Sequence, residues 1–490
     1  MTELSLQKVS GAYYTPDWVC SSLVQWAVRG TADRLLDPSC GDGRFVAAHR
    51  NSVGVEQNRV AAEHARNHAP AATIHQGDFF SWAAGTAERF DCAAGNPPFI
   101  RYQTFKGDVR ARALSQCAAI GVELTGLTSS WAPFLAVTAS LLRSGGRMAF
   151  VVPAEIGHAP YAAPLLEYLA EHFFVVHVVA VRDKLFPGLS EDCWLLYCAG
   201  YGGETKELRF SALAAFSATK VPPAQYTKVP VGDWRENWKR RLRPYLLSSE
   251  TRSLYQAVAA HRDSRRIGEV ASVGIGYVSG ANDFFHLRPS EAKGLGIPVG
   301  FLHPTVRNGR ALTEESLSEA TVERWRQKDE PILLLRISKG AEVPQAVRRY
   351  LDSESGQIAR EAYKCRARDP WYSVPDVQVP DFFLSYMAGR ESSLVRNEAG
   401  CTCTNSLHRV RVHHREGFRR LARAWGTPFT QLSCELEGHP LGGGMLKLEP
   451  GEARQLVLHA PELLPSSKEQ MIEEALIIMR EWRHYGNEAR

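Results

Sequence analysis

Leu35-Leu36-Asp37-Pro38-Ser39-Cys40-Gly41-Asp42-Gly43-Arg44-Phe45 is the stretch of the chain that decides its fold. Its apolar start predicts a short strand, and the segment after the turn has helical spacing. Glycine has no Cβ, so a G-x-G turn lets the main chain approach a ligand closely. A strand, a glycine turn and a helix together are typical of the first step of a nucleotide-binding sheet. G-x-G alone is weak evidence, because an ordinary turn has the same composition.

Further apolar runs follow this unit and predict the rest of an α/β domain. Between them lie segments with apolar residues at three- and four-residue spacing, such as residues 130–142. Strands that alternate with helices indicate a mostly parallel sheet. The last two runs are separated by only a short segment, so we expect one antiparallel strand. The predicted strands are residues 34–36, 52–56, 72–75, 90–94, 147–152, 173–181 and 194–198.

The composition is that of an ordinary globular protein. Of 490 residues, 44% are hydrophobic and 23% charged, which argues against a disordered, collagen-like or coiled-coil chain. Ten cysteines without a C-x-x-C pair are too sparse for a disulfide scaffold. The longest apolar stretch is too short to cross a bilayer, and the beginning of the chain lacks the pattern of a secretory signal. We therefore expect a cytoplasmic protein with no membrane segment.

The net charge of +5 is unevenly distributed along the chain. Residues 1–200 hold 16 basic and 18 acidic residues, a balance of −2, which leaves +7 for the remainder. An excess of positive charge in the second half favours contact with a polyanion there. We expect a catalytic domain over residues 1–205, a linker and helical connection over 206–260, and a β-rich or α+β domain over 261–490 that ends in an amphipathic helix near residues 467–484.

Two further strand ends carry acidic residues with the chemistry of nucleoside binding. Glu56 closes the second predicted strand and can accept hydrogen bonds from both hydroxyls of a ribose. The third strand leads into Gly77-Asp78-Phe79-Phe80, where Asp78 offers an acceptor for an adenine amino group beside an aromatic ring.

The fourth strand ends in Asn96-Pro97-Pro98-Phe99, the most informative tetrapeptide in the chain. Proline has no N–H and a fixed φ, so the turn presents acceptors: the Asn96 side chain and the Pro97 carbonyl. An exocyclic amine that donates to both loses conjugation with its ring, and its lone pair becomes available for attack. Phe99 supplies a face on which a flat heterocycle can stack. A plain two-proline turn is the alternative. It is less favoured because the three preceding strand ends, at Asp37, Glu56 and Asp78, all carry residues suited to ligand binding.

These motifs resemble those of adenine-N6 DNA methyltransferases. Gly11-Ala12-Tyr13-Tyr14-Thr15-Pro16, DPSCGDGRF, GVEQN, GDFF and GNPPF look like motifs X, I, II, III and IV. Their order is that of the gamma group, the TaqI type, in its long form with a C-terminal target-recognition domain. The resemblance implies a class I methyltransferase fold, a Rossmann-like, seven-stranded sheet with one antiparallel strand, followed by a mixed α+β target-recognition domain. It also implies S-adenosyl-L-methionine (SAM) as cofactor and double-stranded DNA as partner.

The resemblance assigns cofactor-binding roles position by position. Thr15 is expected to hold the methionine carboxylate, Asp37 and Gly41 to lie along the methionine, and Glu56 to bind the ribose. Asp78 is expected to take the adenine amino group, and Phe79 to pack on that ring. The full expected cofactor set is Tyr14, Thr15, Pro16, Asp37, Pro38, Cys40, Gly41, Gly43, Glu56, Asp78 and Phe79.

The expected catalytic residues are Asn96, Pro97, Pro98 and Phe99. Many relatives have tyrosine at the position of Phe99, but stacking needs only the ring. A second aromatic residue closes on the other face of the base in this family. Phe186 is our candidate, and the alternative is a phenylalanine that packs the edge of the core. Because the target amine lies inside a stacked duplex, the adenine must be flipped out.

Basic and aromatic residues interleave in the second half, over residues 234–245, 363–372 and 405–419. Such runs bind phosphates or read base edges, although any one of them can be an ordinary solvated face. Residues 278–285 and 442–447 also resemble the target-recognition region of long members of the family. The expected DNA-binding residues are Lys239, Arg240, Arg241, Lys364, Arg366, Arg368, Asn405, His408 and Arg409.

We expect no metal, because Cys401, Cys403 and the nearby histidines match no common zinc spacing. The expected function is the modification enzyme of a restriction–modification pair, active as a monomer, with any cognate restriction endonuclease acting separately. The alternatives are a protein glutamine N5-methyltransferase, an RNA adenine methyltransferase, and a non-catalytic DNA-binding specificity protein. A glutamine methyltransferase needs no large basic appendage, and intact motifs argue against a non-catalytic protein.

Overall fold

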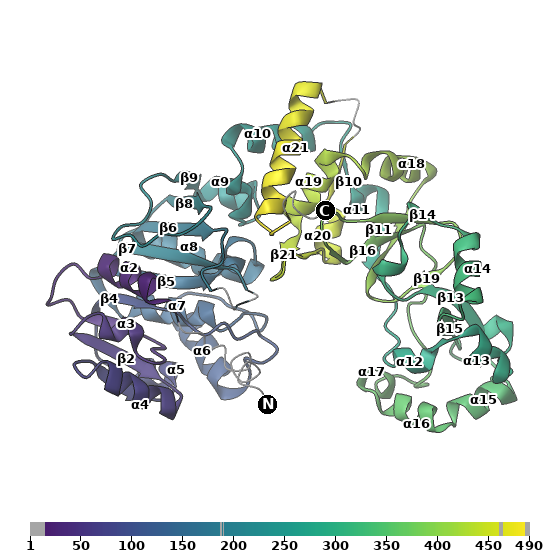
Figure 1. Ribbon diagram of the computed structural model, residues 1–490, viewed down its shortest axis with the longest axis horizontal. Helices are drawn as coiled ribbons and strands as arrows, with labels where there is room; N and C mark the ends of the chain where they lie inside the picture. The colour runs from purple at the N-terminus through teal and green to yellow at the C-terminus, as the bar shows by residue number, and fades with distance from the viewer. Residues whose placement is uncertain (1–14, 187–188, 190, 460–463, 486–490) are drawn as a thin grey trace. The chain divides into compact units, whose positions relative to one another are not determined.

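The computed structural model describes residues 15–186, 189, 191–459 and 464–485, and the chain divides into two compact units, Met1–Leu246 and Leu247–Arg490 (Figure 1). The first unit is built on a nine-stranded sheet in the order β3-β2-β1-β4-β5-β7-β6-β8-β9. Its strands are β1 (Leu35–Asp37), β2 (Ser52–Glu56), β3 (Thr73–Gln76), β4 (Phe90–Gly95), β5 (Leu142–Pro153), β6 (Phe173–Val181), β7 (Cys193–Tyr201), β8 (Glu207–Leu213) and β9 (Thr227–Pro230).

The first seven strands in this spatial order, β3-β2-β1-β4-β5-β7-β6, form the seven-stranded sheet expected from the sequence. The strands from β3 through β5 pair in parallel, and β7 runs antiparallel to both β5 and β6. The α/β, class I methyltransferase fold is therefore confirmed. Two strands extend it: β8 pairs with β6 in parallel, and β9 pairs with β8 in the antiparallel sense.

The segment after residue 205 differs from the expected linker. Leu208 and Phe210 are fully buried and alternate with polar residues, so β8 has the pattern of a strand with one face in the core. Pro222 and Pro223 lie in the connection between β8 and β9 rather than in a strand. Prolines concentrated between two short strands hid the alternation on either side of them.

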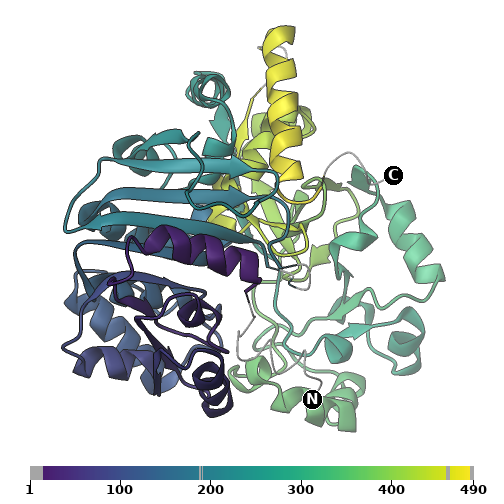
Figure 2. The same ribbon diagram turned by 60° about the vertical axis from the view of Figure 1, so that its left-hand side comes forward.

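Helix α2 (Asp17–Ala27) packs along the sheet, as Figure 2 shows for the dark purple helix. Its buried face, including Val19 and Leu23, joins a core cluster with strand residues such as Leu35, Ala149 and Leu195. The helix predicted over residues 130–142 is confirmed as α7, which ends where β5 begins. The other helices of this unit are α3 (Arg44–Ala47), α4 (Arg59–His68), α5 (Phe79–Gly85), α6 (Gly107–Ala119), α7 (Trp131–Ser140), α8 (Ala163–His172) and α9 (Val231–Glu236).

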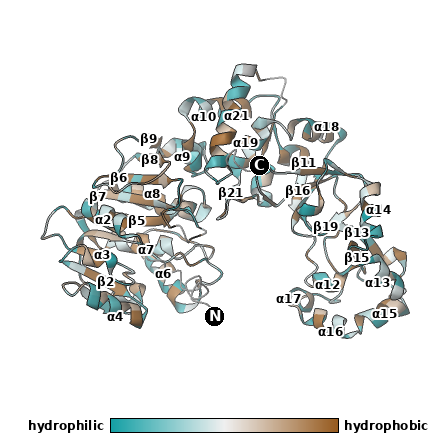
Figure 3. Ribbon diagram, viewed as in Figure 1, coloured by the Kyte–Doolittle hydropathy of each residue, from teal (hydrophilic) through white to brown (hydrophobic). Residues whose placement is uncertain are grey.

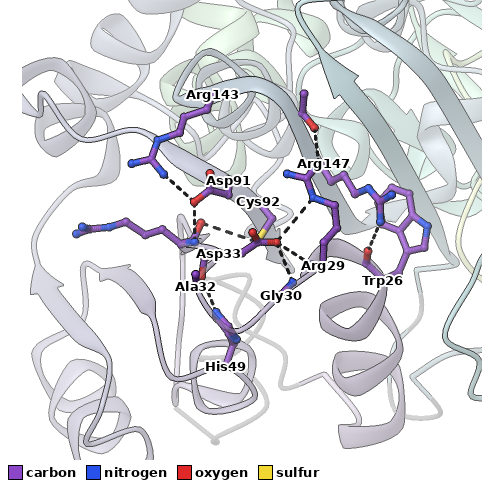
Figure 4. Close-up of polar contacts among 12 residues, drawn as sticks. Trp26, Arg29, Gly30, Ala32, Asp33, His49, Asp91, Cys92, Arg143 and Arg147 are labelled. Atoms are coloured by element: carbon purple, nitrogen blue, oxygen red, sulfur yellow. Dashed lines mark hydrogen bonds and ion pairs between the residues drawn. The ribbon is translucent and has the colours of Figure 1, made fainter.

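Polar contacts tie together the ends of β1, β4 and β5 that lie opposite to the motif-bearing strand ends (Figure 4). Asp91 accepts hydrogen bonds from the main-chain N–H of Arg34 at 2.9 Å and from the side chain of Arg143 at 2.7 Å. Burial raises the pKa of Asp91, but these hydrogen bonds and the Arg143 charge outweigh it, so that the net pKa is lowered. Arg147 donates to the Trp26 carbonyl at 3.1 Å and so ties β5 to α2. This edge of the sheet is braced by structural ion pairs.

The second unit is mixed α+β, as expected, and contains several small sheets. Its strands are β11 (Ala271–Ile275), β20 (Leu407–Val412), β16 (Phe382–Ser385), β18 (Leu394–Asn397) and β14 (Ser316–Leu317) in one sheet; β12 (His286–Leu287), β15 (Leu333–Leu335), β13 (Leu302–Val306) and β19 (Thr402–Cys403) in a second; β17 (Met387–Ala388), β22 (Leu446–Lys447) and β21 (His439–Pro440) in a third; and the pair β10 (Arg265–Arg266) and β23 (Val457–Leu458).

Helices surround these sheets, and the predicted C-terminal helix is confirmed as α21. They are α10 (Ser249–Ala259), α11 (Ile267–Val270), α12 (Asn282–Phe285), α13 (Pro289–Gly294), α14 (Glu319–Gln327), α15 (Gln345–Leu351), α16 (Glu354–Glu361), α17 (Tyr363–Arg366), α18 (Arg415–Ala424), α19 (Pro428–Glu437), α20 (Pro450–Gln455) and α21 (Ser466–Glu481). Apolar residues concentrate in the strands of the larger sheet, where β5 and β6 are brown in Figure 3. Among the described residues, no helix has both the length and the apolar character needed to span a membrane.

Candidate active site

The acidic residues and the Asn-Pro-Pro-Phe turn meet at one edge of the large sheet. Strands β3, β2, β1 and β4 are neighbours and parallel, so their carboxyl ends lie side by side. Asp37 and Glu56 are the last residues of β1 and β2. Asp78 comes two residues after β3, and Asn96 directly follows β4. The structure thus brings together the side chains that the sequence predicted from separate strand ends.

Asp37 is almost completely buried at the end of β1, with 1% of its surface exposed. Its Oδ1 accepts a hydrogen bond from the N–H of Ser39 at 3.0 Å, and its Oδ2 has no hydrogen-bond partner among the described residues. Burial raises the pKa of Asp37 to about 8 against the hydrogen bond from Ser39, and the nearby carboxylates add to the increase. A buried carboxylate with an open acceptor atom suits a cationic ligand group.

A glycine lets β4 approach this carboxylate. A Cβ atom at Gly95 would lie 2.7 Å from Oδ1 of Asp37, closer than side chains pack. The last residue of β4 must therefore be glycine for β1 and β4 to end against each other. The Asn96 side chain follows at once, so Asp37 and the turn after β4 border the same space.

The glycine turn after β1 is folded around the carboxylate of Glu56. Gly41 has a φ of +53° and donates its N–H to Oε2 of Glu56 at 2.9 Å, while Oε1 accepts from the N–H of Asn58 at 2.7 Å. Gly43 has a φ of +91°, and a Cβ there would lie 2.8 Å from Cα of Ala65. Pro38 and Cys40 are buried in the same turn. The turn fixes Glu56 beside a main-chain segment that only glycine can form.

Asp78 begins α5 as its N-cap. Its Oδ2 accepts hydrogen bonds from the N–H and the hydroxyl of Ser81, at 2.9 Å and 2.8 Å, and Nε of Arg112 lies 3.4 Å from the same atom. Oδ1 takes no part in these contacts. The Phe79 ring is buried and stacks on Phe134, with ring centroids 5.1 Å apart and an interplanar angle of 15°. Only 3% of the Phe79 surface is exposed.

The turn after β4 is tied to the turn after β1. The hydroxyl of Ser39 donates to the Asn96 carbonyl across 3.4 Å. Pro97 is buried, whereas Asn96, Pro98 and Phe99 are half-buried. Phe99 packs against the core cluster that contains α2. Part of the Phe99 surface therefore remains available to a ligand.

Thr15 and Pro16 lead into α2, and both lie beside the glycine turn through Arg44. Thr15 is buried, and its carbonyl accepts a hydrogen bond from Nη1 of Arg44 at 3.2 Å. Pro16 is the N-cap of α2. Tyr14, the remaining expected residue of this segment, lies outside the described residues.

Family comparisons agree with this geometry. The family described as type II methyltransferase M.Eco57I, C-terminal domain, matches residues 239–484, half of the chain. The Eco57I restriction-modification methylase family matches residues 48–186, which include the turns after β2, β3 and β4.

The chain belongs to the Eco57I family of type II methyltransferases. Type II methyltransferase M.XamI of Xanthomonas campestris pv. amaranthicola is 24% identical over 93% of this chain and 86% of its own length. M.AccI of Acinetobacter calcoaceticus is 18% identical over 98% of this chain and 90% of its own length. The solved structure of the type IIL restriction-modification enzyme MmeI in complex with DNA is 13% identical, with a TM-score of 0.49, and covers 91% of this chain and 70% of its own.

Membership makes this chain a type II DNA methyltransferase, with SAM as its cofactor. The residues at the strand ends fit SAM. Asp37 offers a buried, open carboxylate oxygen to a cationic group, and the Gly41 turn leaves room for a main-chain approach. When bound, SAM supplies an electrophilic methyl group on a sulfonium. Among the described residues, no group of three or more His, Cys, Asp or Glu side chains is arranged to hold a metal ion.

Phe186 lies in the core cluster against which Phe99 packs, and 7% of its surface is exposed. Both expected stacking residues therefore belong to or border the same core cluster. In the conformation described, however, the Phe186 ring is packed as part of the core edge.

The expected DNA-binding residues of the first basic run are held by the first unit. Nε of Arg240 lies 2.6 Å from Oε1 of Glu167 on α8, and Arg235 contacts the same oxygen at 3.1 Å. Arg241 is buried, and Lys239 also makes contacts within the protein. This run therefore secures the end of the first unit.

In the second unit the expected residues divide into exposed and structural groups. Lys364, Arg366 and Asn405 are exposed. The Arg368 guanidinium donates to the carbonyls of Ser279 and Val278 at 2.7 Å and 2.5 Å, and burial lowers its pKa. Arg368 thus holds the loop after Tyr277.

Two residues on β20 also contact the protein itself. His408 is completely buried, its Nε2 lies 2.6 Å from the Leu448 carbonyl, and burial lowers its pKa. The prediction that His408 faces DNA is wrong for this structure, because an inward position on β20 places it in the core. Arg409 is half-buried and donates to the Ile275 carbonyl at 2.7 Å.

Two contributors to the site were not predicted from the sequence. Arg44 follows the glycine turn, and Ser130 precedes α7, and each bonds to main-chain atoms of an expected motif residue or its neighbour. Arg44 stands within the DPSCGDGRF motif but was given no role there, and Ser130 belongs to none of the motifs, so their contributions come from the three-dimensional contacts.

Proposed function

We propose that this type II methyltransferase transfers the methyl group of SAM to the N6 amino group of adenine in duplex DNA, at one short recognition sequence. The observation that carries the proposal is the Asn96-Pro97-Pro98-Phe99 turn at the carboxyl end of β4, beside Asp37. The turn offers acceptors and a half-buried aromatic ring at the edge where the cofactor-type carboxylates converge.

The turn provides the chemistry that an aromatic amine requires. The Asn96 side-chain oxygen and the Pro97 carbonyl accept the two N–H groups of the amine, which directs its lone pair toward the methyl group. Neither proline can donate a competing hydrogen bond. Because the methyl donor is already electrophilic, alignment and amine polarisation supply most of the catalysis, and no strong base is needed.

The carboxylates hold the cofactor in this proposal. Asp37 binds the methionine ammonium, Glu56 the ribose hydroxyls, and Oδ1 of Asp78 the adenine amino group. Thr15 helps to hold the methionine carboxylate, and the Phe79 edge contacts the adenine. The hydrogen-bond pattern supports the roles of Asp37 and Asp78, because Oδ2 of Asp37 has no partner among the described residues and Oδ1 of Asp78 takes no part in the capping contacts.

Adenine reaches this site only after it leaves the DNA stack, so base flipping is part of the proposal. Phe99 stacks on one face of the flipped base. Phe186 covers the other face only if its segment moves, since its ring is packed in the core edge in the structure described.

The second unit binds the duplex in this proposal through exposed basic residues rather than through its average charge. Leu247–Arg490 hold 33 basic and 31 acidic residues, a balance of +2, and most of the +7 after residue 200 lies in residues 201–246 of the first unit. Lys364 and Arg366 are the best phosphate contacts, because both are exposed on one short helix, α17. R366A should weaken DNA binding and lower the slope of log Kd against log[salt] by about 1, the loss of one phosphate contact. R368A is the matched structural variant: it should lower the free energy of unfolding and leave the salt slope of DNA binding nearly unchanged.

We further propose that the enzyme acts as a monomer, with a cognate endonuclease as a separate protein.

Sequencing that detects base modification tests the activity directly. DNA from a methylation-free host that expresses the wild type should carry N6-methyladenine in one short sequence, and the N96A variant should leave it unmodified while binding SAM nearly normally. An unmodified genome with methylated glutamine in a protein would favour the glutamine alternative, and methylated RNA would favour the RNA alternative. Wild-type DNA binding without any transfer would favour the non-catalytic specificity protein.

A further inference from the structure

Ser130 grips the main chain on both sides of Phe99. This serine is completely buried at the N-cap of α7. Its hydroxyl donates to the Pro98 carbonyl and accepts a hydrogen bond from the N–H of Ile100 at 2.9 Å. Its own N–H donates to the Ile100 carbonyl at 3.0 Å. Three hydrogen bonds from one residue thus enclose the residue that carries the stacking ring.

The turn needs such an external partner because of its composition. Two successive prolines remove two main-chain donors, so the turn cannot close on itself with hydrogen bonds of its own at these positions. A buried carbonyl and a buried N–H left unsatisfied would each be costly. A serine hydroxyl is both donor and acceptor, so one side chain satisfies both groups.

The start of α7 is itself anchored next to Ser130. Nε1 of Trp131 donates to the Tyr161 hydroxyl at 3.0 Å, and that hydroxyl donates to the carboxylate of Glu155, which follows β5. Trp131 is completely buried. The N-terminus of α7, which carries Ser130, is therefore held by the segment that follows β5.

We propose that Ser130 is a positioning residue for methyl transfer, which fixes the Phe99 ring at the angle and depth that the flipped base requires. The proposal rests on the proposed function, and it concerns the chemical step rather than cofactor binding. Ser130 contacts the main chain at Pro98 and Ile100, on either side of Phe99, whereas the carboxylates proposed to bind SAM lie at the ends of β1 and β2 and after β3.

Methyl transfer by S130A tests this directly, with unmethylated DNA from a methylation-free host and labelled SAM. We expect the single-turnover rate to fall about tenfold to a hundredfold, because small displacements of a reacting group have effects of this size. The dissociation constant for SAM should change less than about twofold. The matched control is S140A, at the other end of α7, whose hydroxyl bonds only to the Val137 carbonyl within the helix. Its rate should equal that of the wild type.

A double-mutant cycle distinguishes positioning from general destabilisation. If Ser130 acts through Phe99, S130A should cost little in an F99A background, whereas a structural defect would lower the rate equally in both. Full additivity, or a wild-type rate in S130A, would overturn the proposal. Should S130A fail to fold, S130C keeps the volume and weakens both side-chain hydrogen bonds.

Hydrogen exchange gives a readout that does not need activity. The Ile100 amide should lose protection in S130A and keep it in S140A. Unchanged protection of the Ile100 amide in S130A would show that Ser130 does not hold the turn. If the wild type methylates no DNA, the proposed function fails, and the exchange result still decides whether Ser130 holds the turn.

Discussion

Nη1 of Arg44 donates a hydrogen bond to the main-chain carbonyl of Thr15 at 3.2 Å and joins the segment before α2 to the glycine turn after β1. The same guanidinium contacts Oδ2 of Asp42 at 2.9 Å and Oδ1 of Asp17 at 3.0 Å. One side chain therefore links the two segments that border the methionine end of the proposed SAM site.

Loss of this link should weaken SAM binding without slowing the chemical step. R44M should raise KM for SAM roughly tenfold, because it removes three hydrogen bonds of the guanidinium, one of them to the Thr15 carbonyl. The value of kcat should stay within about twofold. Steady-state kinetics with varied SAM measures both. The control is R59M, since Arg59 forms an exposed ion pair with Glu63 on α4. A drop in kcat with unchanged KM would contradict this role.

Asp37 should make SAM binding depend on pH. Its pKa is about 8 in the ligand-free protein because of burial, and a bound ammonium would favour the ionised form. Affinity for SAM should therefore rise as the pH increases toward 8, and binding below pH 8 should release a proton. Calorimetry in buffers of different ionisation enthalpy measures that proton. D37N should bind at least a hundredfold more weakly and release none.

The same carboxylate should cost stability in the absence of SAM. A carboxyl group whose pKa is raised in the folded state favours folding at low pH, and this contribution is lost as the pH rises from about 4 through 8. D37N should therefore be more stable than the wild type against urea at pH 8, with little difference at pH 4. Equal stabilities of D37N and the wild type at both pH 8 and pH 4 would show that ionised Asp37 does not destabilise the folded chain.

Asp78 has two separable roles, as the N-cap of α5 and as a proposed adenine acceptor. D78A should lose about 1 kcal/mol of stability through the missing cap, whereas D78S should keep most of it. Both variants should bind SAM about tenfold more weakly, because neither retains the second carboxylate oxygen. Urea unfolding and SAM titration of the pair separate the roles. SAM binding by D78S at wild-type strength would rule out the adenine contact.

His177 should make the first unit sensitive to acid. Burial, followed by the Arg209 charge, lowers its pKa to about 4, and its Nε2 lies 2.9 Å from the Ser211 hydroxyl. Protonation then favours the unfolded chain, so stability present above pH 6.5 is lost as the pH falls toward 4, by about 3 kcal/mol. H177Q should lack this component of the pH dependence in urea unfolding, while H64Q, at an exposed position of α4, should keep it.

The strand ends could be predicted because their signals are local. Apolar runs mark β1 to β7, and motifs I to IV begin in or directly after their strands, so the parallel sheet brings these four motifs together whatever the loops do. The sequence alone therefore determined the fold class, the order of the motifs and the residues at the cofactor edge. β8 and β9 were missed because prolines between them outweighed the short alternation of Leu208 and Phe210.

Only the tertiary structure decided which polar residues serve the site and which serve the core. A basic or histidine-rich run looks alike in sequence whether it faces solvent or its own protein. The structure buries His408 on β20 and binds Arg368 to the Val278 and Ser279 carbonyls, but leaves Arg366 exposed. It also brings Ser130 to the main chain of Pro98 and Ile100, and Arg44 to Thr15. A hydrogen bond requires two atoms about 3 Å apart. Residues separated by about 30 positions in the chain come that close only when the chain folds.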